Sequence, residues 1–296
     1  MIRSAGILGP AKLTGLVLRE LRYDLLAVVM VATAMVFLGK ALPLQGAAAV
    51  VPLLGVVVSI FIGFRNSTAF NRWWEARTLW GTVVGNCRAL DNAFTAVDDR
   101  SEQMAVTLDR MRRRQVRHAW QLAAELRRVP ATAAVGELTP EDPPDATSGT
   151  LLKLQAAEAR DLVLADHIDR QGRVILTNLN TAQANAAGGL ERIRNQPIPL
   201  YYSFFVRGLA WFFGIMVCTR MDAGAHMSLS GVIAGVLIMA LFVVAERLGY
   251  FAEEPMSNTV FDLPMDHFCA GITADLLGTA HPLARPPQDS DAAVWT

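Results

Sequence analysis

Asp266, His267 and Cys269, near the C-terminal end of the chain, carry side chains of the types that bind metal ions. On a helix, residues one and two positions apart do not face each other, so these three would not converge on one ion. The five histidines and three cysteines are otherwise scattered, with no CxxC pair and no HExxH zinc motif. The GxxxxGK[ST] phosphate loop, the GxSxG nucleophile elbow and the GxGxxG dinucleotide fingerprint are absent as well. We therefore expect no metal site, no cofactor and no enzymatic activity.

Arginines form the densest run of charge, at residues 112–114 and 117, next to His118. One interpretation is a patch that attracts anions or lipid headgroups. The other is a solvated helix face whose charge is balanced by nearby acids: Asp98, Asp99, Glu102 and Asp109. Over the whole chain, 27 Lys and Arg balance 27 Asp and Glu, so the basic excess typical of nucleic-acid-binding domains is missing. We expect no nucleic-acid partner.

Four apolar segments must position any functional side chains: residues 25–39, 41–64, 201–219 and 227–245. Charged residues make up only 18% of the sequence, below the roughly 25% that is usual in soluble domains. The first segment is short for a membrane crossing, but Leu42 and Leu44 extend it, and the long side chain of Lys40 can reach the interface. A soluble protein would have to bury four such helices in one chain. We therefore predict four transmembrane helices.

Positive residues lie before the first span and directly behind the second: Arg3, Lys12, Arg19, Arg22, Arg65, Arg72 and Arg77. The two short connections between spans hold little charge beyond Lys40, Arg220 and Asp222. Because positive residues gather on the cytoplasmic side, we expect both termini and the long segment 65–200 to lie inside the cell, with the protein in the inner or plasma membrane. A second span follows the first at once, so the first is expected to be retained rather than cleaved as a signal peptide.

The segment between the second and third spans has helical patterning throughout. Helices are expected at 65–96, 101–129, 151–168 and 173–194. Pro130 ends one of them, and residues 139–150 form a loop rich in proline and acid. No alternating strand pattern is present, so we predict an all-α membrane protein. Its expected regions are 1–64 with the first two spans, 65–200 as a cytoplasmic helical region, 201–247 with the last two spans, and 248–296 as a cytoplasmic C-terminal helix and tail.

The second span has no turn signal at its end and continues as a helix into the polar segment. Along it, Val56, Ile60 and Phe64 lie four residues apart and so share one face. Gly55 and Gly63 flank them and would allow close helix packing. Copies of this helix around an axis would form stacked apolar rings, which can gate ions by dewetting. Ordinary helix packing or lipid contact is the alternative.

Three further features could serve function or structure. Arg207 lies inside the third span, where a charge is costly; it either lines the outer pore or pairs with Glu246 or a backbone carbonyl. Glu246 ends the fourth span and, in the simplest interpretation, is exposed at the interface. Arg72, Trp73 and Trp74 follow the second span, and tryptophans at this position typically anchor a helix at the membrane boundary.

Three blocks of the sequence resemble the bestrophin family, and its bacterial branch most closely. Residues 63–81 read GFRNSTAFNRWWEARTLWG, similar to the family's stretch at the end of its second transmembrane helix. Residues 188–199 read GGLERIRNQPIP, similar to the run before the third span. Residues 245–266 resemble the segment after the last span. The resemblance covers nearly the whole chain in order.

This resemblance implies a homopentameric ion channel with one central pore on the fivefold axis. The pore of the family narrows at a hydrophobic neck, and counting back from the RWW triplet places that neck at Val56, Ile60 and Phe64. A second constriction is implied in the cytosolic part, near Val174 or Ile175. The implied partners are other copies of the chain, monovalent ions and membrane lipid. Because eukaryotic members mostly pass anions and bacterial members can pass cations, the resemblance leaves ion selectivity open.

The acidic cluster that binds calcium in eukaryotic bestrophins is mostly missing here. In residues 254–262, only Asp262 keeps a carboxylate at a matching position, and Thr259 replaces another. Calcium requires six to eight oxygen ligands with several carboxylates. We therefore expect no calcium gating of this kind.

Two other function classes remain open. A membrane-anchored helical scaffold or regulatory protein would conduct no ions. A secondary transporter would require inverted repeats or broken helices at the membrane midplane; Pro52 in the second span suggests a break only weakly, and no repeat accompanies it.

Overall fold

A computed structural model describes residues 9–39, 50–196, 198–220, 229–257 and 262–285 of the 296-residue chain. The described part contains α-helices and one short 3₁₀ helix, and no strand, which confirms the predicted all-α class. The helices are α1 (Gly9–Gly39), α2 (Val50–Val97), α3 (Glu102–Arg127), α4 (Ala133–Gly136), α5 (Ser148–Leu164), α6 (Arg170–Asn195), α7 (Leu200–Cys218), α8 (Leu229–Glu253), α9 (Met265–Leu277) and the 3₁₀ helix η2 (Pro282–Ala284).

The chain divides into two compact units, and α2 contributes to both. We call the described residues of Ser4–Trp73 and Pro197–Pro255 the span unit; it holds α1, α7, α8 and the first half of α2. We call those of Trp74–Gln196 and Met256–Thr296 the polar unit; it holds the second half of α2 and the remaining helices. As predicted, α2 continues without a break through the end of its apolar stretch, over 48 residues in all.

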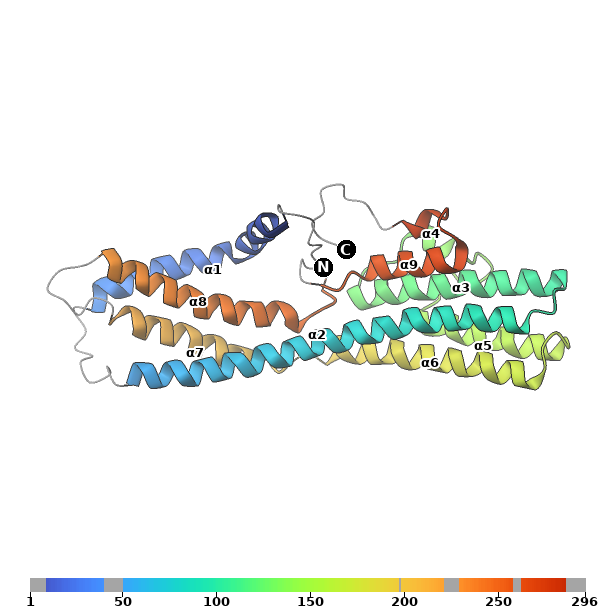
Figure 1. Cartoon of the computed structure of the whole chain (residues 1–296), viewed down its shortest axis with the longest axis horizontal. Coiled ribbons are helices and arrows are strands. Elements are labelled where there is room, and N and C mark those ends of the chain that lie inside the picture. Colours follow the sequence, from blue (N-terminus) through green and yellow to red (C-terminus); the bar gives the residue numbers. More distant parts are fainter. Residues whose placement is uncertain (1–8, 40–49, 197, 221–228, 258–261, 286–296) are drawn as a thin grey trace. The chain divides into compact units, whose positions relative to one another are not determined.

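Inside the span unit, α7 and α8 lie side by side, and α1 packs along both (Figure 1). One apolar core joins these three helices: Val28, Ala32, Cys218, Met239 and Val243. A second core joins α2 to α7, through Val58, Ile62, Val206, Ala210, Phe213 and Val217. Glycines permit the closest approaches. A Cβ atom added at Gly55 would lie 3.1 Å from the Phe213 ring, and one at Gly249 would lie 2.0 Å from Oδ1 of Asn66.

Three helices of the described residues are long and apolar enough to cross a membrane: α2, α7 and α8. They contain the described parts of the second, third and fourth predicted spans, except that Thr219 lies one residue beyond α7; residues 41–49 and 227–228 lie outside the described part. The first predicted span, 25–39, is helical within α1, but Val36, Phe37 and Gly39 are described only as part of the helix backbone. All of 40–49, which includes Leu42 and Leu44, lies outside the described residues. The count of four spans therefore stays a prediction.

In the polar unit, α3 is central and packs against α5, α6 and α9. Its core is a cluster of buried apolar side chains from α2, α3, α5, α6 and the α5–α6 connection: Leu90, Ala93, Phe94, Met104, Leu108, Met111, Ala159, Leu162, Ile168 and Leu176. Side-chain caps set where three helices begin. The Ser101 hydroxyl accepts a hydrogen bond from the Met104 amide at the start of α3, and Thr147 and Asp169 cap α5 and α6 in the same way. α2 and α6 run antiparallel, since Leu79 approaches Gly189 and Val97 approaches Gly172.

Two of the four arginines in this run of α3, Arg114 and Arg117, are buried, so the interpretation as a solvated face is wrong for these two. Arg114 forms a bidentate pair with Asp142, with both N–O distances 2.7 Å, and also bonds Glu158 at 2.9 Å. Arg117 is buried as well and donates to the carbonyl oxygens of Thr139, at 3.0 Å, and Pro143, at 2.7 Å. The cause is the predicted loop, which folds over α3 and supplies oxygen acceptors to these guanidinium groups.

Burial of His118 in this unit gives a pH-dependent stability. Burial lowers the pKa of His118 from 6.5 to about 4, although the carbonyl of Ser148 contacts Nδ1 at 3.0 Å. His118 binds a proton below about pH 6.5 in the unfolded chain, but only below about pH 4 in the folded chain. We therefore expect the free energy of unfolding to fall by up to about 1.4 kcal/mol per pH unit within that window. Thermal unfolding of the purified protein in detergent, at pH 7 and at pH 5, measures the loss.

The control for this prediction is His118→Gln, which keeps a donor for the Ser148 carbonyl but does not titrate. Carboxylates with a lowered pKa change the free energy of unfolding in a more acidic pH range than His118 does. Burial disfavours the charged form of Asp142, but the Arg114 guanidinium has the larger effect and lowers the Asp142 pKa. The stability gained from the charged form of Asp142 is therefore lost only below pH 3.8, the ordinary pKa of the group. An unchanged pH slope between pH 6.5 and 5 in His118→Gln would contradict the assignment to His118.

Candidate functional site

The predicted neck residues form an exposed apolar row on α2. Val56, Ile60 and Phe64 have relative exposures of 58%, 51% and 67% in the single chain. On the opposite face of the same helix, Val58 and Ile62 are buried in the core with α7. The helix therefore uses one apolar face for its own fold and leaves the other apolar face free for contacts beyond the described chain. Val174 and Ile175, the candidates for a second constriction, are also exposed, on α6.

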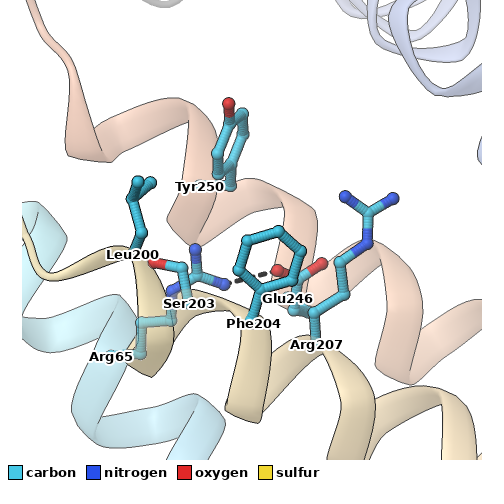
Figure 2. Close-up of a pocket in the computed structure, with 7 residues that line it drawn as sticks. All are labelled: Arg65, Leu200, Ser203, Phe204, Arg207, Glu246 and Tyr250. Carbon is cyan, nitrogen blue, oxygen red and sulfur yellow. Dashed lines mark hydrogen bonds and ion pairs between the residues drawn. The ribbon is translucent and has the colours of Figure 1, made fainter.

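Arg65, directly after the last neck residue, lies on the buried side of α2. Its side chain is only 1% exposed and forms ion pairs with Glu246 and, at 3.0 Å, with Glu253 on α8. The Ser203 hydroxyl of α7 donates to Glu253 at 3.2 Å, and Asn66 donates to the Ala245 carbonyl at 3.0 Å. Figure 2 shows the Arg65 guanidinium reaching Glu246 across the space between α2 and α8. This cluster fastens α2 to α7 and α8 beside the exposed row and so fixes the rotation of α2.

A second cluster joins α1, α7 and α8. The carboxylate of Asp24, which is nearly buried, accepts hydrogen bonds from Arg207 at 3.0 Å and from Arg247 at 2.7 Å. The expected pairing of Arg207 with Glu246 is therefore wrong, because Arg207 pairs with Asp24 and Glu246 pairs with Arg65. Glu246 is also buried rather than exposed at an interface.

Sequence reasoning did not identify Arg65, Asp24, Glu253 or Arg247 as members of these clusters. One feature of the sequence nevertheless indicates such a partner for Arg207. A charge inside an apolar helix requires a partner of opposite charge at a similar depth, and Asp24, beside the first apolar segment, is such an acid. The choice among Asp24, Glu246 and Glu253 depends on helix packing, which the sequence does not specify.

The aromatic anchors divide between the two units. Trp73 stacks on Phe70, with ring centroids 6.1 Å apart, and Trp74 is more than half exposed, while Arg72 is half-buried. Their role at a membrane boundary stays a prediction. The segment expected to lack a calcium site is only partly described: Asp262 is buried and accepts from the Ser257 hydroxyl at 3.4 Å, whereas Thr259 lies outside the described residues.

Asp266 and Cys269 have separate partners in the polar unit. Asp266 pairs with Arg127, and the Cys269 thiol contacts the Ala119 carbonyl at 3.4 Å. Within the part of the chain that the structure covers, no group of three or more His, Cys, Asp or Glu side chains is arranged to hold a metal ion. Burial also raises the pKa of the Cys87 thiol to about 12, so this side chain stays an uncharged thiol.

The sequence matches one family of known proteins over most of its length. Residues 6–278 match the family model described as "Bacterial/Fungal Bestrophin protein". The chain is 28% identical over 236 residues to the voltage-dependent anion channel-forming protein YneE of Salmonella typhi, covering 76% of this chain and 74% of that one. It is 28% identical over 250 residues to the voltage-dependent anion channel-forming protein mll4386 of Mesorhizobium japonicum, covering 80% and 77%.

A solved structure shares the fold. The crystal structure of a bacterial bestrophin homologue from Klebsiella pneumoniae superposes with a TM-score of 0.79 at 25% identity, covering 88% of this chain and 100% of that one. The match of the family model over most of the sequence, together with the all-helical fold, confirms the resemblance noted from the three sequence blocks. The chain belongs to the bacterial and fungal bestrophin family.

Proposed function

We propose that this protein is an ion channel through which monovalent ions pass passively along the axis of a homopentamer. The observation that carries the proposal is the exposed row of Val56, Ile60 and Phe64 on a helix able to cross a membrane. In a membrane a long apolar face of this kind contacts lipid, packs against another helix or lines a pore, and copies around an axis would turn it into three stacked rings. The family membership and the names of the relatives as channel-forming proteins support conduction over the alternative of a non-conducting scaffold.

The proposed neck acts by dehydration. An apolar ring offers an ion no ligands to replace its water, so the barrier to passage grows steeply as the ring narrows. None of the three side chains carries a charge, so the neck by itself does not select the sign of the ion. The names of the curated relatives favour anions. We propose no calcium-clasp gating, because residues 254–262 hold too few carboxylates.

The proposed setting is the inner or plasma membrane, with both termini in the cytoplasm. The regions proposed are 1–64 with two spans, 65–200 as a cytoplasmic helical region, 201–247 with two spans, and 248–296 as a cytoplasmic tail. The partners proposed are further copies of the chain, monovalent ions and membrane lipid, without nucleic acid.

Reversal potentials in asymmetric KCl test this function. Purified protein is reconstituted in planar bilayers, and its mass in solution is measured in parallel. A channel gives a current whose reversal potential moves toward the chloride or the potassium equilibrium potential, and a mass of five chains. A scaffold gives no current above that of bare lipid, and its mass need not correspond to five chains. Absence of current from protein that is folded and pentameric would contradict the proposal.

A further inference from the structure

A pocket of about 160 Å³ lies in the span unit between α2, α7 and α8. Arg65, Ser203, Arg207, Glu246 and Tyr250 provide its polar lining, and Leu200 and Phe204 add apolar surface (Figure 2). Since a water molecule in the liquid occupies about 30 Å³, the pocket has room for about five waters or for polar groups of the same total volume. It lies apart from the exposed face of α2 that carries the proposed neck.

One buried carboxylate oxygen at this pocket has no partner. Oε1 of Glu246 accepts from Arg65, but Oε2 is buried and has no hydrogen-bond partner among the described residues. Figure 2 shows this second oxygen turned away from Arg65, on the side of Arg207. A buried carboxylate oxygen without a donor is costly, and such groups in proteins are normally satisfied by a protein group, a water or a ligand. The site therefore requires a hydrogen-bond donor from outside the described chain.

Two ionic clusters with opposite excess charge each contribute side chains to the lining of the pocket. On the Glu246 side, one cation faces two carboxylates, because Arg65 pairs with both Glu246 and Glu253. On the Arg207 side, two cations face one carboxylate, because Asp24 is shared by Arg207 and Arg247. The Arg207 side chain is 39% exposed, so its guanidinium can donate hydrogen bonds to a further anionic partner. An excess of negative charge thus lies beside an excess of positive charge, a layout that complements a zwitterion.

The rim of the pocket is apolar. Leu200 and Phe204 are largely exposed, and both belong to α7, a helix long and apolar enough to cross a membrane. A ligand with hydrocarbon chains would cover these side chains while its head enters the pocket. A soluble amino acid or amine would leave them exposed.

We propose that this pocket binds the headgroup of a phospholipid that carries a primary ammonium and a phosphate, such as phosphatidylethanolamine. The ammonium donates to Oε2 of Glu246, and the phosphate accepts from the Arg207 guanidinium. The bound lipid supplies the missing donor and links α7 and α8 beside the cluster that fixes the rotation of α2.

Native mass spectrometry of the full-length protein in detergent tests the site in the wild type. The protein is titrated with phosphatidylethanolamine, with its mono-, di- and trimethylated forms, and with phosphatidylglycerol, all with the same acyl chains. We expect affinity to fall by about tenfold from the primary ammonium to the trimethylated form, because the latter has no N–H to donate to a charged acceptor. Phosphatidylglycerol, which has no cation, should bind as weakly as the trimethylated lipid.

Two variants test which side chain binds the ammonium of the headgroup and which binds the phosphate. Glu246→Gln should abolish the preference for the primary ammonium while keeping binding of the trimethylated lipid. Arg207→Gln should lower the affinity for both lipids by about tenfold, because both carry the phosphate that Arg207 binds. Arg173→Gln, at an exposed arginine of α6 in the polar unit, is the control and should change neither.

Three results would overturn the proposal. Equal affinities across the methylation series in the wild type would show that no donor enters the pocket and that water satisfies Glu246. Wild-type preference retained in Glu246→Gln would place the ammonium elsewhere. Thermal stabilisation by soluble phosphoethanolamine equal to that by the lipid would show that the acyl chains, and so the membrane, contribute nothing to the site.

Discussion

Replacing Arg65 with methionine is expected to destabilise the protein by about 3–5 kcal/mol. The variant leaves Glu246 and Glu253 in a buried cluster without their shared cation, and an uncompensated buried charge is far more costly than the loss of one contact. The cost falls on the span unit, because the cluster joins α2 to α8. Thermal unfolding and the yield of folded protein in detergent measure the loss.

Two controls separate charge from packing in this experiment. Arg65→Met combined with Glu246→Gln and Glu253→Gln removes the whole ionic cluster at similar volume and should recover much of the stability. Arg88→Met in the polar unit breaks an ion pair with Asp275 whose members are largely exposed, and should cost less than about 1 kcal/mol. An Arg65→Met protein as stable as the Arg88→Met protein would show that the buried cluster does not hold α2.

Shortening the middle neck residue, Ile60→Ala, is expected to raise single-channel conductance. Removal of most of the side chain at each copy would widen the ring and let ions keep more of their water, which lowers the barrier. Ile60 is half exposed in the single chain, so the substitution should leave the core of the span unit intact. Currents from purified protein in planar bilayers measure the change.

The matched control is Ile62→Ala, two residues further along α2. Ile62 is buried against α7, so truncation there should create a cavity and cost about 2–5 kcal/mol of stability. It should not raise conductance, because the residue faces away from the proposed pore. A higher conductance in Ile62→Ala and none in Ile60→Ala would show that the faces of α2 are assigned the wrong way round.

The helices of this protein could be predicted from sequence because their signals are local. The uncharged run before Arg65 and the helical spacing beyond it predicted one continuous helix, which α2 confirms. Ser101 was predicted as a helix start, and its hydroxyl caps α3. Each of these features depends on residues a few positions apart, which patterning and capping preferences determine directly.

The ionic partners could not be predicted because they connect helices far apart in sequence. Arg207 was expected to line the outer pore or to pair with Glu246 or a backbone carbonyl, yet it pairs with Asp24 of α1. Arg65 follows an apolar run and suggested a cytoplasmic interface charge, yet it is buried between α2 and α8. Which acid reaches which arginine depends on the rotation and depth of each helix, and close glycine contacts such as that of Gly249 with Asn66 help to set these.

The conductance of a triple variant, Val56→Ala with Ile60→Ala and Phe64→Ala, tests whether these three side chains line the pore. Wild-type and variant proteins are purified as folded oligomers of the same mass and compared in the same planar bilayers and salt. If the three rings form the neck, the wild type conducts and the variant, with all three rings cut back, has a clearly larger single-channel conductance. Equal conductance of the two proteins would contradict the assignment of these three residues to the pore.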